Sequence, residues 1–179
     1  MRRRAVFLDR DGVLNRTVFR DGKPRAPDRP EEFEFFPDVE GAIADLRTAG
    51  FAIVVVTNQP DVARGWQTRA NVEAMNAIVR EKLAVDALKV CFHDSEANCA
   101  CRKPLPGMLV EAARELEIDL VRSIMIGDRE SDLRAGVAAG CGVNLFVNAR
   151  ASENGPSDGR FSSLGEAVSW ILSQAKSEL

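Results

Sequence analysis

The run of residues 51–56 constrains the fold more than any other part of the chain. Its sequence, Phe-Ala-Ile-Val-Val-Val, is apolar throughout and lacks the alternation of apolar and polar residues that a half-exposed strand shows. Such a run is typical of a strand in a parallel sheet that helices cover on both faces. The chain has 179 residues, 45% of them hydrophobic, so it is long enough to bury such a strand within one domain.

Apolar runs and helical patterns alternate along the whole chain. Further strands are predicted at residues 5–8, 88–92, 124–126 and 143–147. Amphipathic spacing predicts helices at residues 39–49, 68–83, 107–116, 131–139 and 164–177. Because strands joined by helices form right-handed crossovers, the pattern predicts an α/β fold, a Rossmann-like parallel sheet with helices on both faces.

Two stretches interrupt this alternation. Residues 16–37 contain several prolines and an Asp-Gly turn signal, which predict a turn-rich loop beside the end of the first strand. Residues 151–163 are rich in Ser, Gly and Asn and predict a flexible connection to the last helix. Neither stretch is long enough for a large cap domain. We therefore expect a single domain, residues 1–179, with an open pocket that its loops shape.

The charge balance and the apolar runs limit the kinds of partner. The formal net charge of −3 argues against a general nucleic-acid-binding or membrane-binding surface. Only four apolar residues precede Asp9, too few for the core of a signal peptide, and no run approaches the length that spans a membrane. We expect a cytoplasmic, monomeric protein that acts on a small molecule, with no nucleic-acid or membrane partner.

Two aspartates follow the first predicted strand, at the point where it gives way to a loop. Side chains at positions i and i+2 of an extended segment point the same way, so Asp9 and Asp11 should face one pocket while Arg10 points elsewhere. Ligand sites of α/β folds lie outside the carboxyl ends of the strands. An isolated Asp-x-Asp more often only caps the end of a strand. Whether these two aspartates belong to a functional site therefore depends on the residues at the other strand ends.

The other predicted strands end in compatible chemistry. Thr57 and Asn58 follow the second strand, Lys103 lies beyond the third, and Asp128 follows the fourth. Carboxylates can hold a divalent cation such as magnesium, which prefers oxygen ligands. A lysine, a hydroxyl and loop amides can bind phosphoryl oxygens, and two carboxyl groups can serve as nucleophile and as general acid and base. Together these residues predict a site for phosphoryl transfer.

A second cluster contains three of the four cysteines and the only histidine of the chain. It consists of two pairs separated by five residues, Cys91 with His93 and Cys99 with Cys101. Three thiolates and an imidazole can close a tetrahedral zinc site, which favours a structural role because no position stays open for water. The alternative, reduced cysteines in a core with an incidental histidine, conflicts with the polar segment 94–98. A zinc loop at residues 91–101 would fix the position of Arg102 and Lys103.

Four short motifs occur in a fixed order along the chain. They are Asp9-Arg10-Asp11-Gly12, Val55-Val56-Thr57-Asn58, Arg102-Lys103-Pro104 and Gly127-Asp128. In this order they resemble the motifs of the haloacid dehalogenase superfamily of phosphatases, and the resemblance extends from residue 5 to residue 147. Segments at residues 56–59, 63–65, 99–104 and 106–108 further resemble the heptose-bisphosphate phosphatase group, to which the histidinol-phosphate phosphatases are related.

The resemblance implies a magnesium-dependent phosphatase that works through an aspartyl-phosphate. It makes Asp9 the nucleophile and Asp11 the general acid and base. The other implied roles are Thr57, Asn58 and Lys103 for the phosphoryl group, Arg64 and Arg102 for the distal part of the substrate, and Asp9, Asp128 and the main-chain carbonyl of Asp11 for magnesium. Asp132, one helical turn after Asp128, would cap its helix or support the site, and we favour the cap.

Three hypotheses for the activity stay open. The leading one is removal of the 7-phosphate of D-glycero-D-manno-heptose 1,7-bisphosphate, a small phosphorylated sugar used for lipopolysaccharide and other heptose-containing glycans. The second is a phosphatase of histidinol phosphate or another small phosphomonoester, because Pro60 and Asp61 replace the Ser-Gly that is common in the heptose enzymes. The third is a non-catalytic, zinc-stabilised binding protein. The clustered charges at the strand ends argue against it, because such a protein does not need them.

Overall fold

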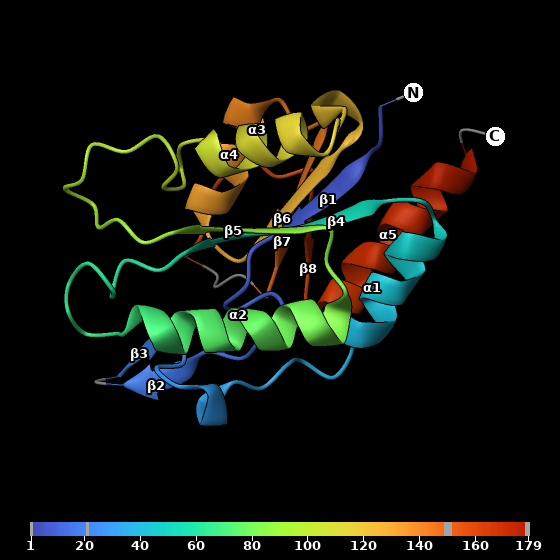
Figure 1. Ribbon diagram of the computed structural model, residues 1–179. Coiled ribbons are helices and arrows are strands. Elements are labelled where there is room, and N and C mark those ends of the chain that lie inside the picture. Colours follow the sequence, from blue (N-terminus) through green and yellow to red (C-terminus); the bar gives the residue numbers. More distant parts are fainter. Residues whose placement is uncertain (1, 21, 149–151, 178–179) are drawn as a thin grey trace.

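Six parallel strands form the central sheet of the computed structural model, which describes residues 2–20, 22–148 and 152–177 (Figure 1). They are β1 Ala5–Leu8, β4 Ala52–Asn58, β5 Ala87–Cys91, β6 Ile124–Gly127, β7 Val143–Val147 and β8 Gly159–Phe161. The strand order is β5-β4-β1-β6-β7-β8, and every neighbouring pair is parallel. The predicted parallel sheet is confirmed. Residue 151, where the expected flexible connection begins, lies outside the described residues.

Five α-helices cover the two faces of this sheet. They are α1 Val39–Thr48, α2 Arg69–Leu83, α3 Gly107–Glu115, α4 Glu130–Ala139 and α5 Leu164–Ser177, with short 3-10 turns at Pro30–Glu32 and Leu120–Arg122. Helices α1, α2 and α5 lie on one face, and α3 and α4 lie on the other (Figure 1). Within the described ranges, no helix combines the length and the apolar character needed to cross a membrane.

Strand β4 shows why the run at residues 51–56 is apolar without interruption. Ile53 and Val55 pack in the core beneath α1, α2 and α5, whereas Val54 and Val56 pack in the core beneath α3 and α4. All four side chains are fully buried. Successive side chains of a strand point to opposite faces, so a strand covered on both faces must be apolar at every position.

Local signals set the helix boundaries close to their predicted positions. Helix α2 begins after Thr68, whose Oγ1 accepts a hydrogen bond from the Asn71 N–H at 3.2 Å. Helix α1 is followed by Gly50, which has a φ of +85° that a residue with a side chain rarely adopts. The predicted helix at residues 39–49 is observed at 39–48, and the one at 68–83 is observed at 69–83.

Three short strands were not predicted. Strands β2 Val18–Arg20 and β3 Lys23–Arg25 form an antiparallel hairpin inside the expected turn-rich loop, and β8 lies inside the expected flexible connection. Each has three residues, too few to show a periodicity. Strand β8 forms only because it pairs with the edge of β7, where Leu145 lies opposite Gly159. This pairing depends on tertiary structure and has no signal in the local sequence.

Asp86 ties the start of β4 to its surroundings. Its carboxylate accepts a hydrogen bond from the Ile53 N–H at 2.9 Å and forms ion pairs with Arg3 at 3.0 Å and Arg47 at 3.4 Å. Partial burial opposes ionisation, but these donors outweigh it and hold the pKa of Asp86 below its ordinary value. The carboxylate therefore stabilises the folded protein in its ionised form.

We expect Asp86→Asn to lower the free energy of unfolding at pH 7 by about 1–2 kcal/mol, because hydrogen bonds and ion pairs to a charged acceptor are weakened. The folded-state pKa lies below the unfolded value of about 3.9, so this stabilisation is present above that pH and disappears as the pH falls through the folded-state pKa. Denaturant unfolding from pH 7 to pH 2 measures it. The exposed Asp45→Asn is the control, and an equal effect of both substitutions at pH 7 would contradict the prediction.

Candidate active site

A pocket of about 510 Å³ opens at the carboxyl ends of the strands. Its walls come from the β2–β3 hairpin, from the segment after β4, from the segment before α3 and from the start of α4. The predicted site residues that line it are Asp9, Asp11, Asn58, Arg64, Arg102 and Lys103. Asp128 lines an adjoining hollow, and Thr57 is buried beside Gln59. The loops after β4 and β5 extend from this same end of the sheet (left in Figure 1).

Three carboxylates meet at the base of this pocket. Oxygen atoms of Asp9, Asp128 and Asp132 all lie within 4.8 Å of one another. Burial raises the pKa of Asp9 to about 6, with Lys103 opposing the shift and Asp132 adding to it. Burial also raises the pKa of Asp128 to about 8, reinforced by the charges of Asp9 and Asp132. Burial and repulsion among the carboxylates therefore both oppose ionisation of this cluster.

The donor set fits a divalent cation that prefers oxygen ligands. Oδ1 of Asp128 is buried and has no hydrogen-bond partner among the described residues. Arg129 Nε lies 3.9 Å from this oxygen, too far for a hydrogen bond. A buried carboxylate oxygen without a donor is unfavourable unless something else neutralises it. Magnesium or a similar hard cation between Asp9 and Asp128 would do so.

Lys103 is the cation that the protein itself supplies to the cluster. Its Nζ lies 2.7 Å from Asp9 Oδ1 and 2.7 Å from Asp132 Oδ1, and it donates a hydrogen bond to the Val56 carbonyl at 2.8 Å. Only 3% of the residue is exposed. Burial alone would lower its pKa, but Asp132 and Asp9 raise the pKa above its ordinary value. Lys103 therefore stays charged next to Asp9.

Asn58 holds the Lys103 segment in place. Its Nδ2 donates to the Lys103 carbonyl at 3.0 Å, and its Oδ1 accepts from the Lys103 N–H at 3.1 Å. Asn58 is the last residue of β4, so this pair of hydrogen bonds joins the strand end to the chain after Cys101. Each end of the amide has a partner in the Lys103 main chain, and these contacts fix its orientation at the pocket wall.

Asp11 lines the pocket, and three side chains donate hydrogen bonds to its carboxylate. It accepts hydrogen bonds from Arg10, Asn15 and Gln59, all of them buried. Arg10 does not line the pocket, which agrees with the prediction that it points away from the two aspartates. Its guanidinium nevertheless forms an ion pair with the Asp11 carboxylate at 3.0 Å. The structure thus brings Asp9 and Asp11 into one pocket, each next to its own buried cation.

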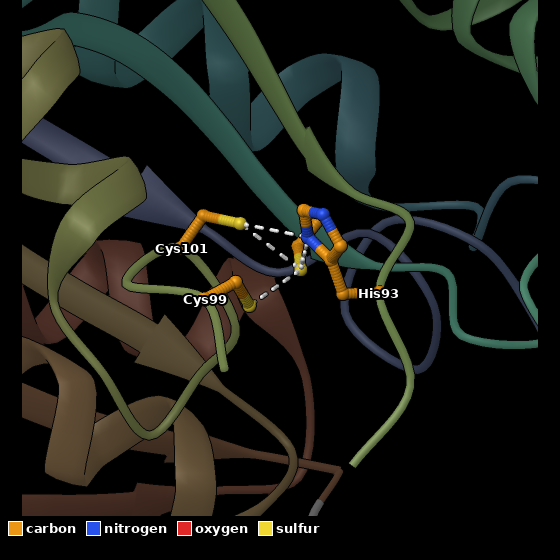
Figure 2. Close-up of side chains that lie close together, drawn as sticks. His93, Cys99 and Cys101 are labelled. Carbon is orange, nitrogen blue, oxygen red and sulfur yellow. Dashed lines mark hydrogen bonds between the residues drawn. The ribbon is translucent and has the colours of Figure 1, made fainter. Parts of the chain in front are cut away.

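The predicted zinc ligands converge at the end of β5 (Figure 2). Cys91 Sγ lies 3.2 Å from Cys101 Sγ and 3.9 Å from Cys99 Sγ, and His93 Nδ1 lies 3.3 Å from Cys101 Sγ. All four ligand atoms lie within 4.8 Å of one another, and the cysteines are not joined by disulfides. Zinc–sulfur bonds of about 2.3 Å in a tetrahedron require sulfur atoms about 3.8 Å apart, so the cluster has the size of a zinc site.

Two predicted arginines reach the pocket through separate supports. Arg102 Nη1 donates to the His93 carbonyl at 3.2 Å, which connects the pocket wall directly to the cysteine and histidine cluster. Arg64 forms an ion pair with Asp61 at 3.1 Å, and its guanidinium lies 5.5 Å from the centre of the Trp66 ring. These contacts hold both guanidinium groups at the pocket wall.

The structure decides roles that the sequence left open. Asp132 does cap its helix, since Oδ2 accepts from the Arg129 N–H at 3.0 Å, but its other oxygen binds Lys103. Lys23 and Arg25 belong to the basic loop that the sequence leaves open between surface and pocket, and the β2–β3 hairpin brings them into the lining. Arg129, before the start of α4, is a lining residue that sequence reasoning missed.

The comparisons with known proteins agree with this geometry. A family model for haloacid dehalogenase-like hydrolases matches residues 15–140. The chain belongs to the haloacid dehalogenase-like hydrolases. The resemblance that the motifs indicated is therefore confirmed at the level of the family.

Relatives among these hydrolases align with most of the chain. A protein of Helicobacter pylori (strain J99) is 34% identical over 94% of this chain and 97% of its own length, and one of Escherichia coli (strain K12) is 39% identical over 80% of this chain and 78% of its own length. Both are named D-glycero-beta-D-manno-heptose-1,7-bisphosphate 7-phosphatase.

A solved structure of a bacterial phosphatase superposes on almost the whole chain. The D,D-heptose 1,7-bisphosphate phosphatase of B. bronchiseptica, crystallised with magnesium and phosphate, matches with a TM-score of 0.82 and 33% identity. The match covers 96% of this chain and 99% of that structure.

Gly12 provides a test of how tightly the site is built. Its φ is +95°, and a Cβ atom at this position would overlap Asp128 Oδ2 and lie 2.7 Å from Asp128 Cγ. We expect Gly12→Ala to lower the free energy of unfolding by about 2–4 kcal/mol, because backbone strain adds to overpacking. Thermal and denaturant unfolding measure the change.

Gly22→Ala is the matched control for this substitution. Gly22 has a φ of +70°, and apart from its chain neighbours no atom of the described residues lies within 4 Å of the position that a Cβ would take, so this variant carries the backbone strain alone. We expect it to lower the free energy of unfolding by about 1 kcal/mol. Equal losses for the two variants would show that Asp128 does not press against Gly12.

Proposed function

We propose that this protein is a magnesium-dependent phosphomonoester hydrolase that removes the 7-phosphate of D-glycero-D-manno-heptose 1,7-bisphosphate. The observation that carries the proposal is Asp9, buried at the base of a cation-lined pocket with the Lys103 ammonium 2.7 Å away. The names of relatives that align with nearly the whole chain support the choice of substrate.

In the proposed mechanism, a carboxylate oxygen of Asp9 attacks the phosphorus atom while the bond between phosphorus and the sugar oxygen breaks. The carboxyl group of Asp11 gives its proton to the departing sugar oxygen. Asp11 then takes a proton from the water molecule that attacks the aspartyl-phosphate, which releases phosphate and regenerates Asp9. Lys103 neutralises part of the phosphoryl charge throughout both steps.

Magnesium would be held by the carboxylates of Asp9 and Asp128 and by the main-chain carbonyl of Asp11. When bound, it supplies positive charge to the phosphoryl oxygens and to the carboxylate cluster. Asp132 supports this arrangement through Lys103, which it holds beside Asp9. Thr57 and Asn58 would contact the phosphoryl group from the end of β4.

Cations around the pocket mouth favour a substrate with a second phosphate. The lining contains five basic residues apart from Lys103: a lysine and four arginines from four separate segments, Lys23, Arg25, Arg64, Arg102 and Arg129. Guanidinium groups bind phosphate in a bidentate manner, so Arg64 and Arg102 suit the distal phosphate of a bisphosphate. Histidinol phosphate carries an ammonium group and no second phosphate, so these cations would repel it rather than bind it. This charge pattern favours the heptose bisphosphate over the histidinol-phosphate hypothesis.

The deciding experiment measures phosphate release with magnesium from both anomers of heptose 1,7-bisphosphate and from histidinol phosphate. We expect wild type to hydrolyse a heptose substrate, and Asp9→Asn to lower its kcat by more than about 10³-fold because the nucleophile is lost. Asp45→Asn, an exposed aspartate outside the pocket, is the control. Activity confined to histidinol phosphate would support the second hypothesis, and no turnover of any substrate would favour a binding protein.

We also propose that Cys91, His93, Cys99 and Cys101 bind a structural zinc ion. It would fix the Arg102 side chain, whose guanidinium already donates to the His93 carbonyl, and the start of the Lys103 segment. Cys141 lies apart from the cluster and is buried on its own.

Metal analysis of the purified protein tests the zinc proposal. We expect about one zinc per chain in wild type and in Cys141→Ala, and a loss of zinc in Cys99→Ser, because a tetrahedral site needs all four ligands. The KM for the heptose substrate should rise in Cys99→Ser as Arg102 loses its support. Wild-type protein that folds and turns over substrate without zinc would refute the proposal.

A further inference from the structure

Arg10 is the largest side chain that is fully buried in the described part of the protein. The mechanism above gives it no role, and it does not line the pocket. A buried guanidinium is unfavourable unless charged and polar partners surround it. Its presence beneath the site therefore requires an explanation in terms of its contacts.

The Arg10 guanidinium donates hydrogen bonds to both carboxylate oxygens of Asp11. Nη2 lies 3.1 Å from Asp11 Oδ1 and 3.0 Å from Asp11 Oδ2, and Nε lies 3.3 Å from Oδ1. Nη1 points the other way and donates to Asn76 Oδ1 at 2.8 Å. Asn76 is a fully buried residue of α2, so Arg10 is anchored to a helix on one side and to Asp11 on the other.

Two further donors complete the contacts of Asp11. Asn15 Nδ2 donates to Oδ1 at 3.0 Å, and Gln59 Nε2 donates to Oδ2 at 2.7 Å. Gln59 is in turn tied to Thr57 Oγ1 at 2.9 Å. Each carboxylate oxygen thus has donors from two different side chains, which hold the carboxylate in one orientation.

We propose that Arg10, assisted by Asn15 and Gln59, is a positioning residue that holds the Asp11 carboxyl group where it can exchange a proton with the sugar oxygen and with water. This inference rests on the proposed function, since it assigns Arg10 a role only through Asp11. Misplacement of a reacting group by 1 Å can lower a rate by about 10²-fold, so a planar clamp on both oxygens has a large kinetic effect. The simpler alternative is that Arg10 only stabilises the fold.

Substrates with different leaving groups separate these two roles. A sugar oxygen leaves as an alcohol and needs the proton of Asp11, whereas the nitrophenolate of p-nitrophenyl phosphate leaves without one. We expect Arg10→Lys, which keeps the charge but loses the planar fork, to lower kcat/KM for the heptose bisphosphate by about 10- to 100-fold. The value for p-nitrophenyl phosphate should change by less than about threefold, because its leaving group needs no general acid. A loss of stability alone would lower both values equally.

Asn76→Ala removes the anchor of Arg10 without touching Asp11 or the pocket, so it tests the inference even if Arg10→Lys does not fold. We expect this variant to lower kcat/KM for the heptose bisphosphate by less than Arg10→Lys does, again with little change in the value for p-nitrophenyl phosphate. The double variant should be no worse than Arg10→Lys, because the two residues act through one contact. Arg16→Lys is the matched control, since Arg16 pairs with Glu34 on the surface and should leave both values unchanged.

Asp11→Asn, measured with the same two substrates, separates failure of this inference from failure of the proposed function. Selective loss in Asp11→Asn, with equal or no loss in Arg10→Lys and Asn76→Ala, would overturn the role of Arg10 alone. If Asp11→Asn itself shows no selectivity between the substrates, the acid and base role assigned to Asp11 is what fails.

Discussion

The contact between Lys103 and Asp9 is the interaction on which the rest of the site depends. The two residues are 94 positions apart in sequence, and their side chains meet where almost no solvent reaches. Removing one partner from a buried ion pair is strongly destabilising because it leaves an uncompensated charge. The end of β1 and the segment before α3 must therefore be placed together, and Asn58 and Asp132 hold Lys103 on either side.

Charge compensation around the pocket follows one pattern. Each of the two aspartates after β1 has a buried cation of its own: Lys103 for Asp9 and Arg10 for Asp11. Among the described residues, Asp128 has only the exposed Arg129, 3.9 Å away, and burial together with the charges of Asp9 and Asp132 raises its pKa. The protein is therefore organised so that the uncompensated carboxylate lies where a magnesium ion would complete the site.

The cations proposed to recognise the substrate lie outside the sheet. The ends of β1, β4 and β6 carry the aspartates and polar side chains proposed for phosphoryl transfer, whereas the hairpin, the segment after β4 and the segment after Cys101 carry Arg25, Arg64 and Arg102. Surface segments of this kind can change without disturbing a core. Asp61, which pairs with Arg64, belongs to this wall of the pocket rather than to the carboxylate cluster.

The sequence by itself determined the parallel sheet, its covering helices and the convergence of the four motifs, because apolar periodicity and strand-end chemistry are local properties that short segments display. It also indicated the cysteine and histidine cluster through spacing alone. Only the tertiary structure decided the pairing of β8, the hairpin that brings Lys23 and Arg25 to the pocket, and the double role of Asp132. It also decided that the guanidinium of Arg10 contacts the carboxylate of Asp11. These features depend on contacts between residues far apart in the chain, or on the direction of a long side chain, and neither has a period that a sequence pattern can show.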